Sequence, residues 1–157
     1  MLKIVSVYDG CVVLGGAVSR PLDLTVVSPG ILGFAENFML PLSSISSFVG
    51  DGALAGPGGI LLDDGRAFDV PASLTCVDDF TWGLANGSTL ALPANYDASQ
   101  LRISIGDPDA YFGRLVVTGD ETVTGKPKFV YGKKGYRAVR EAAGWRIVGG
   151  GMMLIFR

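Results

Sequence analysis

The 157-residue chain contains no histidine, and this absence removes several classes of chemistry. Ser-His-Asp and Cys-His catalysis both need an imidazole as the general base, and histidine is a common zinc ligand. There are only two cysteines, Cys11 and Cys76, which are too few for a disulfide scaffold or a thiolate zinc site. Both lie in apolar runs, so we expect buried free thiols. We therefore expect no bound metal and no cofactor.

Long helix-forming stretches are also scarce, because 23 glycines and 8 prolines interrupt the chain. Four turn sequences instead separate short apolar runs: Asp9-Gly10, Asp64-Gly65, Asn86-Gly87 and Gly132-Lys133-Lys134-Gly135. Asp-Gly and Asn-Gly favour two-residue β-hairpins, since a type I′ turn needs positive φ at both central residues. The sequence thus predicts an all-β fold containing four hairpins.

Basic side chains are rare in the first two thirds of the chain. Residues 1–101 hold three basic and ten acidic groups, whereas residues 102–157 hold ten basic and five acidic groups. The small total charge of −2 therefore hides a dipolar molecule whose opposite ends can attract in neighbouring copies. Alternatively, the acidic groups only keep the N-terminal surface soluble. We predict an acidic sandwich-like or jelly-roll-like unit over residues 1–97 and a basic, small antiparallel β module over residues 98–157.

No uncharged run is apolar enough to span a bilayer as a helix, so we expect no membrane partner. Asp9 interrupts the first apolar run before it reaches the length of a secretory signal, which favours synthesis in a reducing cytoplasm. The last apolar run, Met152–Phe156, is expected to form a closing strand or to dock on a neighbour.

Serine and glycine dominate residues 43–59, where we expect a long loop. Isolated apolar residues within this loop, Phe48 and Leu54, are candidates for contact with a neighbouring molecule. The alternative is a mobile surface loop.

Without histidine, catalysis would have to use carboxylates. The adjacent pairs Asp63-Asp64 and Asp78-Asp79 are the candidates for a glycan hydrolase, which needs two carboxylates across one cleft. Sequence gives no sign that two of them face one another, and Asp64 is already explained by its turn. We therefore expect a protein that is not an enzyme.

Residues 126–146 combine basic and aromatic side chains, as many nucleic-acid-binding surfaces do. Along the strand expected at residues 126–131, however, the lysines alternate with Phe129 and Tyr131, so charges and rings fall on opposite faces. Because a stacking surface needs both on one face, we expect no nucleic-acid partner. The candidate surface for an acidic protein partner comprises Lys126, Lys128, Lys133, Lys134 and Arg137.

The spacing of glycines and aromatics near the C-terminus resembles a known family. The segments that carry the resemblance are Phe112-Gly113, Gly125-Lys126-Pro127, Tyr136-Arg137-Ala138-Val139 and Gly144-Trp145-Arg146-Ile147. Over about residues 110–150 they are similar to a small β module of bacteriophage structural and tail-associated proteins, with the pattern Asn-Gly-x-Tyr, Asn-Gly-Lys-Pro-x-Tyr and Gly-Trp-x-Ile. Phe112 and Thr124 stand where that pattern has asparagine. Alternation places Trp145 and Ile147 on one face, where we expect a small core.

The resemblance implies a non-enzymatic structural protein of a bacteriophage virion, assembled in the host cytoplasm. We predict a homo-oligomer, expected to be a trimer, that serves as a capsid decoration (cement) protein or head-fibre base and contacts the major capsid protein. One alternative is a tail or tail-fibre component that contacts host glycan, with Trp82 or Trp145 as the sugar platform. The second alternative is the carboxylate-dependent glycan hydrolase.

Overall fold

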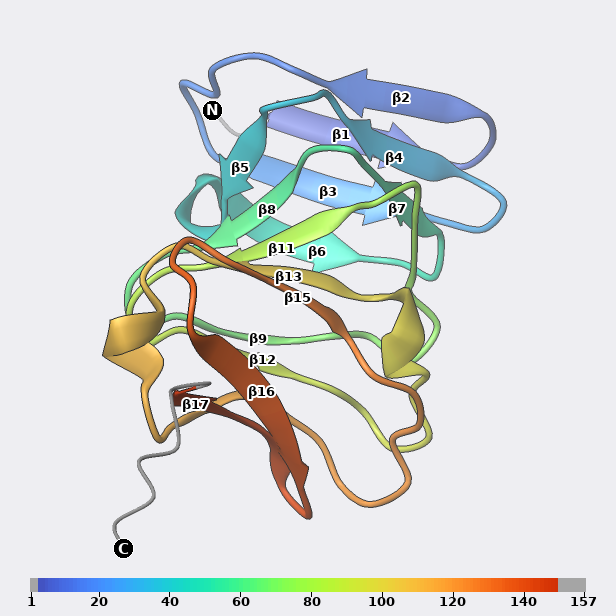
Figure 1. Ribbon diagram of the computed structural model, residues 1–157. Helices are drawn as coiled ribbons and strands as arrows, with labels where there is room; N and C mark the ends of the chain where they lie inside the picture. The colour runs from blue at the N-terminus through green and yellow to red at the C-terminus, as the bar shows by residue number, and fades with distance from the viewer. Residues whose placement is uncertain (1–2, 150–157) are drawn as a thin grey trace, which may run out of the picture.

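The chain is wound into a β-solenoid-like arrangement of short strands, seen in a computed structural model that describes residues 3–149 (Figure 1). The strands form four sheets. Sheet A contains β1 (Lys3–Val7), β3 (Leu22–Val26) and β6 (Ile45–Val49), in that spatial order. Sheet B has the order β10 (Thr75–Val77), β7 (Ala53–Ala55), β4 (Ile31–Phe34) and β2 (Cys11–Leu14).

Sheets C and D contain the remaining strands. Sheet C has the order β15 (Lys128–Tyr131), β13 (Arg102–Ile105), β11 (Thr81–Leu84), β8 (Gly59–Leu62) and β5 (Met39–Pro41). Sheet D has the order β16 (Tyr136–Glu141), β17 (Gly144–Gly149), β14 (Leu115–Thr118), β12 (Thr89–Ala91) and β9 (Ala67–Asp69). Residues 3–149 also include three short 3₁₀ helices: η1 (Leu42–Ser44), η2 (Ala98–Gln100) and η3 (Pro108–Tyr111).

Successive coils place equivalent residues next to one another. The paired residues include Ala53 and Thr75 in sheet B, Gly59 and Thr81 in sheet C, and Ala67 and Thr89 in sheet D. In each case the partner lies 22 residues further along the chain, and the two strands are parallel. Stacked coils of this kind bury a continuous core that no single coil could bury alone.

The all-β prediction is confirmed, but the predicted sandwich or jelly roll is wrong. Those folds pair antiparallel strands within each sheet, whereas all strand pairs in sheets A, B and C are parallel. Strands on both sides of the predicted boundary at residue 97 are also neighbours, since β11 pairs with β13 in sheet C.

The four predicted hairpins are corners of the solenoid instead. The strands that flank Asp64-Gly65 belong to sheets C and D, as do those that flank Asn86-Gly87. Gly65 and Gly87 do adopt positive φ, 70° and 75°, and their corners stack because the Gly65 N–H donates to the Asn86 carbonyl. A corner therefore shares the positive φ of its glycine with a type I′ hairpin turn, but Asp64 and Asn86 do not adopt positive φ, and the next strand pairs with a different coil.

The same correction applies to the other two turns. Asp9-Gly10 joins β1 of sheet A to β2 of sheet B, and residues 132–135 join β15 of sheet C to β16 of sheet D. Within residues 3–149 the one antiparallel hairpin is formed by β16 and β17, around Ala142 and Ala143, where the sequence carries no Asp-Gly or Asn-Gly signal.

The expected long loop over residues 43–59 is also wrong, because β6 and β7 form there. The apolar residues of this segment serve the solenoid: Leu54 is fully buried, and Phe48 is half-buried against the core. The predicted closing strand at Met152–Phe156 lies outside the described residues. Within the residues that are described, no helix is long and apolar enough to cross a membrane.

Ladders of inward-facing apolar residues form the core. In sheet C the ladder runs through Leu40, Ile60, Trp82, Ile103 and Phe129. In sheet B it runs through Leu32, Leu54 and Cys76. Full burial of one such aliphatic side chain stabilises the fold by about 1.5–3 kcal/mol relative to exposure. The buried apolar residues form one continuous cluster, which explains how very short strands remain ordered.

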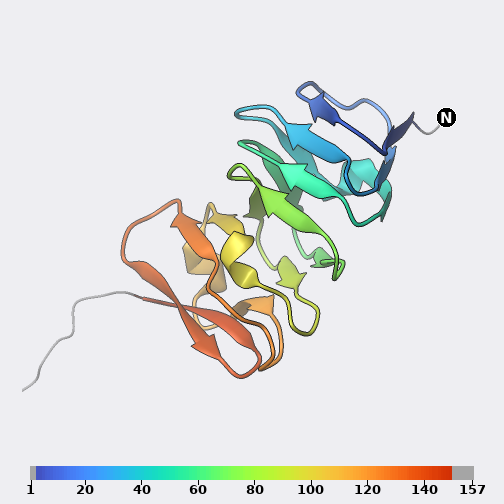
Figure 2. The ribbon, with the colours of Figure 1, turned by 90° about the vertical axis from the view of Figure 1, so that its right-hand side faces the viewer.

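The C-terminal hairpin closes sheet D, where β17 pairs antiparallel with β14. Trp145 and Ile147 face inward and are buried, at 1% and 0% exposure, which confirms that they share a buried face. The hairpin and the first two strands, β1 and β2, lie at opposite ends of an elongated molecule (Figure 2).

Candidate interaction groove

A groove of about 290 Å³ lies beside β15 and the start of β16. Its walls come from two segments, residues 126–131 and 136–138. β15 is the edge strand of sheet C, and β16 is the edge strand of sheet D. Because the two strands belong to different sheets, they separate after the corner at residues 132–135 and leave a groove between them.

Aromatic side chains line the groove. The rings of Phe129 and Tyr131 are stacked, with centroids 6.2 Å apart and an interplanar angle of 11°, and Tyr136 lies 6.5 Å from Tyr131. Phe129 and Tyr131 continue the inward-facing ladders of sheet C, and among residues 3–149 no strand pairs with the outer edge of β15. All three aromatic residues are half-buried. Burial raises the pKa of the Tyr131 phenol, which therefore stays protonated at neutral pH.

Three basic side chains also line the groove: Lys126, Lys128 and Arg137, all of them exposed. None of the residues that line it is acidic. Lys128 comes from β15 and Arg137 from β16, so the corner between them brings together charges from two different sheets. The groove therefore offers positive charge and aromatic surface to an anionic partner.

The two remaining predicted lysines lie elsewhere. Lys134 is exposed at the corner but does not line the groove. Lys133 pairs within the chain, with its Nζ 2.5 Å from Asp109 Oδ2 and 3.5 Å from Asp107 Oδ1. The hydrogen bond to Asp109 raises the pKa of Lys133. The ion pairs connect the corner at residues 132–135 to the preceding corner at residues 107–109. Lys133 is therefore a poor candidate for contact with a partner.

The alternation argument for β15 is confirmed only in part. Lys128 is exposed, while Phe129 and Tyr131 turn toward the core as predicted. The sequence did not reveal that Tyr136 and Arg137 of the next strand complete a groove in which rings and charges occur together.

Leu54 and Trp82 cannot belong to an interaction surface, because both are 0% exposed. Trp82 packs between Phe68 and Phe80, with ring centroids 5.2 Å and 5.1 Å away. A glycan platform needs an exposed ring face, so the role predicted for Trp82 is wrong. Phe48 keeps only partial exposure, since its ring packs edge-on against Phe68 at 6.1 Å.

The carboxylate pairs lie at different corners of the solenoid. Asp63-Asp64 comes directly after β8, and Asp63 Oδ2 accepts a hydrogen bond from the Ser43 N–H at 2.8 Å. Asp78-Asp79 precedes β11, and both residues have positive φ, 52° and 59°. Among the described residues, no three His, Cys, Asp or Glu side chains are grouped so that they could hold a metal ion.

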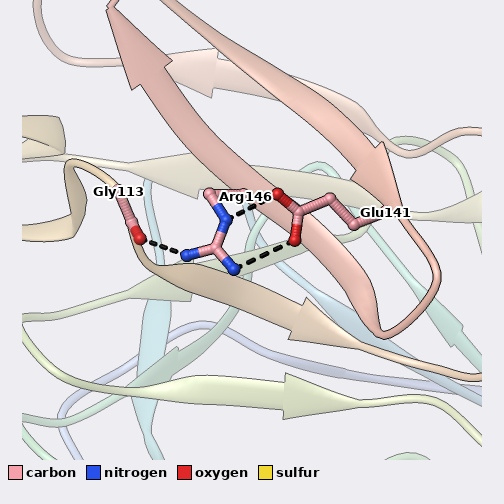
Figure 3. Close-up of polar contacts among 3 residues, drawn as sticks. All are labelled: Gly113, Glu141 and Arg146. Atoms are coloured by element: carbon pink, nitrogen blue, oxygen red, sulfur yellow. Dashed lines mark hydrogen bonds and ion pairs between the residues drawn. The ribbon is translucent and has the colours of Figure 1, made fainter.

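An ion-pair clamp fixes the hairpin that forms one wall of the groove (Figure 3). Arg146 binds both carboxylate oxygens of Glu141, with Nε to Oε1 at 2.6 Å and Nη2 to Oε2 at 2.9 Å. Its Nη1 donates to the carbonyl of Gly113 on the segment that leads into β14. These hydrogen bonds hold the pKa of Glu141 below its usual value. One guanidinium thus links both strands of the hairpin to the solenoid.

The same end carries a cation–π contact. The Arg140 guanidinium lies 4.4 Å from the centroid of the Trp145 ring, and its Nη2 donates to the Asp120 carbonyl at 2.7 Å. Contacts of this kind limit the freedom of β16, so Tyr136 and Arg137 are held in position.

Comparisons of the chain with protein families, with curated proteins and with solved structures found no match.

Proposed function

We propose that this chain is a non-enzymatic structural protein of a bacteriophage virion, and that it acts as a capsid decoration protein or head-fibre base. The observation that carries the proposal is the groove beside β15 and β16, which combines three exposed basic side chains with half-buried aromatic rings and includes no carboxylate. Such a surface suits an acidic patch on another protein, of which the major capsid protein is the first candidate.

The rest of the fold supports a structural role. The inward-facing side chains form a continuous core. The hairpin is fixed by the ion pair between Arg146 and Glu141, two residues of the chain itself. A pre-formed groove of this kind loses little conformational entropy on binding, which favours a permanent assembly contact.

The location in the virion is tested by composition. Mass spectrometry of purified particles should find the chain at high copy number if it decorates the capsid, and at a few copies if it belongs to a tail or fibre. Virions that lack the chain altogether would overturn the proposal.

The binding surface is tested by charge reversal. Arg137→Glu places an acidic group in the groove and should weaken binding to capsids assembled without this chain by about tenfold. Lys134→Glu is the matched control, because Lys134 is exposed nearby but does not line the groove. Equal effects of the two substitutions would show only a general charge requirement and would contradict the assignment of the groove.

A further inference from the structure

At the N-terminal end of the solenoid, β1 is the first strand of sheet A. Among residues 3–149, β1 pairs with β3 alone, so no described strand covers its other edge. Soluble proteins normally protect such an edge with charges, proline or a covering segment. Here the side chains on and beside it are apolar and exposed: Ile4 at 71% and Tyr8 at 62%.

The main-chain groups of β1 are divided between the two edges. The Lys3 N–H donates to Pro21 and the Val7 carbonyl accepts from Val27, so odd-numbered residues bond toward β3. Since these groups alternate along a strand, the N–H and C=O of Ile4 and Ser6 point to the free edge. This edge can therefore accept another strand.

The sequence of β1 and the next two residues is self-complementary. Residues 3–9 are Lys-Ile-Val-Ser-Val-Tyr-Asp, with Ser6 at the centre. β1 ends at Val7, and Tyr8 and Asp9 lie in the bend toward β2, where Asp9 Oδ1 accepts a hydrogen bond from the Gly10 N–H. If two copies run antiparallel about Ser6, Val5 faces Val7 of the other copy within the strands. Beyond the strand end, Ile4 and Lys3 then lie toward the bend residues Tyr8 and Asp9, so apolar meets apolar and charge meets opposite charge.

We infer that β1 pairs with β1 of a second copy of this chain, in a two-fold antiparallel register centred on Ser6. In this register the two Ser6 residues exchange a pair of main-chain hydrogen bonds, because their N–H and C=O groups face the free edge. The contact is isologous, as a two-fold axis requires. Val5 is half-buried, and it lines a cavity of about 270 Å³ beside β1 that the second copy would close.

The occupant is a second copy because this register uses the whole segment. A register centred on Val5 would place Lys3 against Val7 and Ile4 against Ser6, so neither the charged nor the exposed apolar side chain would meet its match. Only the Ser6 register pairs both charges and both exposed apolar side chains at once. A two-fold contact gives a dimer rather than the trimer expected from the sequence.

The first test is mass. Sedimentation of the full chain should show a species of twice the 16.4 kDa chain mass that dissociates on dilution. A protein that stays monomeric at high concentration, or forms only trimers, would overturn the proposal. The dimer does not rest on a place in a virion, so this result is independent of the proposed function.

The second test is charge exchange. Lys3→Asp alone and Asp9→Lys alone each create two like-charge contacts, and each should weaken the dimer by about tenfold. An equimolar mixture of the two variants should dimerise as well as the unaltered protein, because opposite charges face again in the mixed pair. The double substitution should do the same. Failure of both mixture and double variant to recover dimer would refute the register.

The third test is apolar. Ile4→Lys should abolish the dimer without unfolding the monomer, because Ile4 is largely exposed. The matched control is Val49→Lys, at 61% exposure on β6, the opposite edge strand of the same sheet. Circular dichroism should show that both variants remain folded. A dimer that survives Ile4→Lys, or is lost with Val49→Lys, would place the contact elsewhere and contradict the proposal.

Discussion

Replacement of Trp82 tests the core of the solenoid and the rejected glycan platform in one experiment. The ring is 0% exposed, it is in register with Ile60 and Ile103 on the neighbouring strands, and it packs between two phenylalanines. Removal of such a buried aromatic ring costs about 3–5 kcal/mol, the sum of lost apolar transfer and the cavity that remains. Because small proteins unfold with about 5–15 kcal/mol, Trp82→Ala should remove a large part of the stability.

Trp82→Phe should behave differently. Within the described part of the chain, the indole Nε1 has no hydrogen-bond partner, and the nearby Cys76 thiol is only a weak acceptor. A buried N–H without a partner costs about 1–3 kcal/mol, and phenylalanine removes that N–H while keeping one ring. The relief offsets part of the lost packing, so we expect Trp82→Phe to cost about 2 kcal/mol less than Trp82→Ala.

The assay is urea unfolding monitored by far-ultraviolet circular dichroism, with Val49→Ala as an exposed control. The slope with urea must be compared among variants, because stacked coils can unfold in parts. A Trp82→Ala protein with unaltered stability would refute the core placement. Loss of glycan binding in such a stable variant would instead restore the surface role.

Three further predictions concern reactivity, pH and backbone fit. The burial expected for both thiols is wrong for Cys11, which is exposed and should react with a thiol reagent in the folded protein. Burial raises the pKa of Cys76 to about 12, so this thiol should react only on unfolding, and equal rates would contradict this. Because hydrogen bonds from Arg146 lower the pKa of Glu141, their contribution is present above the unfolded pKa of about 4.5 and is lost as the pH falls through the lower folded value. The melting temperature of Glu141→Gln should therefore be less sensitive to acid, and an equal acid response would refute the clamp. Gly59→Ala should prevent folding, since a Cβ there overlaps a carbonyl oxygen of the next coil; soluble, cooperative unfolding would contradict that geometry.

Much of the local structure could be predicted because turn conformation depends on only a few residues. Gly10, Gly65 and Gly87 all have positive φ, as predicted, whereas the residues before them do not adopt the positive φ that a type I′ turn also needs. The partner of each flanking strand, by contrast, is set by pairing across the core, and here that partner lies in another coil. Local chemistry therefore located the corners and could not distinguish a corner from a hairpin.

One sequence signal for the solenoid was present and was missed. Residues 60–74 and 82–96 share a pattern at a spacing of 22, with Gly65 and Gly87 at the turn and Pro71 and Pro93 six residues later. This spacing equals the coil length seen in the sheets. Because only two copies of the pattern are clear, the repeat is easily overlooked, yet a systematic search for internal repeats would favour a solenoid over a sandwich.

The groove could not be found from the sequence of one strand. Its basic and aromatic residues come from β15 and from β16, and their meeting depends on where sheets C and D end. Alternation within β15 alone gave the correct facing of Lys128 and Phe129, but it carries no information about the neighbouring strand. The burial of Leu54 and Trp82 was hidden for the same reason, since both depend on contacts between coils.

The two proposed contacts lie at opposite ends of the molecule, so they make a joint prediction (Figure 2). A dimer joined through β1 carries two grooves at its far ends and can bind two acidic sites at once. On a surface densely coated with the acidic partner, Ile4→Lys should weaken apparent binding, because the monomeric variant carries one groove where the dimer carries two. In solution, with single acidic sites in excess, the same variant should bind as the unaltered protein does, whereas Arg137→Glu should be weak in both formats. Loss of solution binding in Ile4→Lys would show that the two ends are not independent, and would contradict this arrangement.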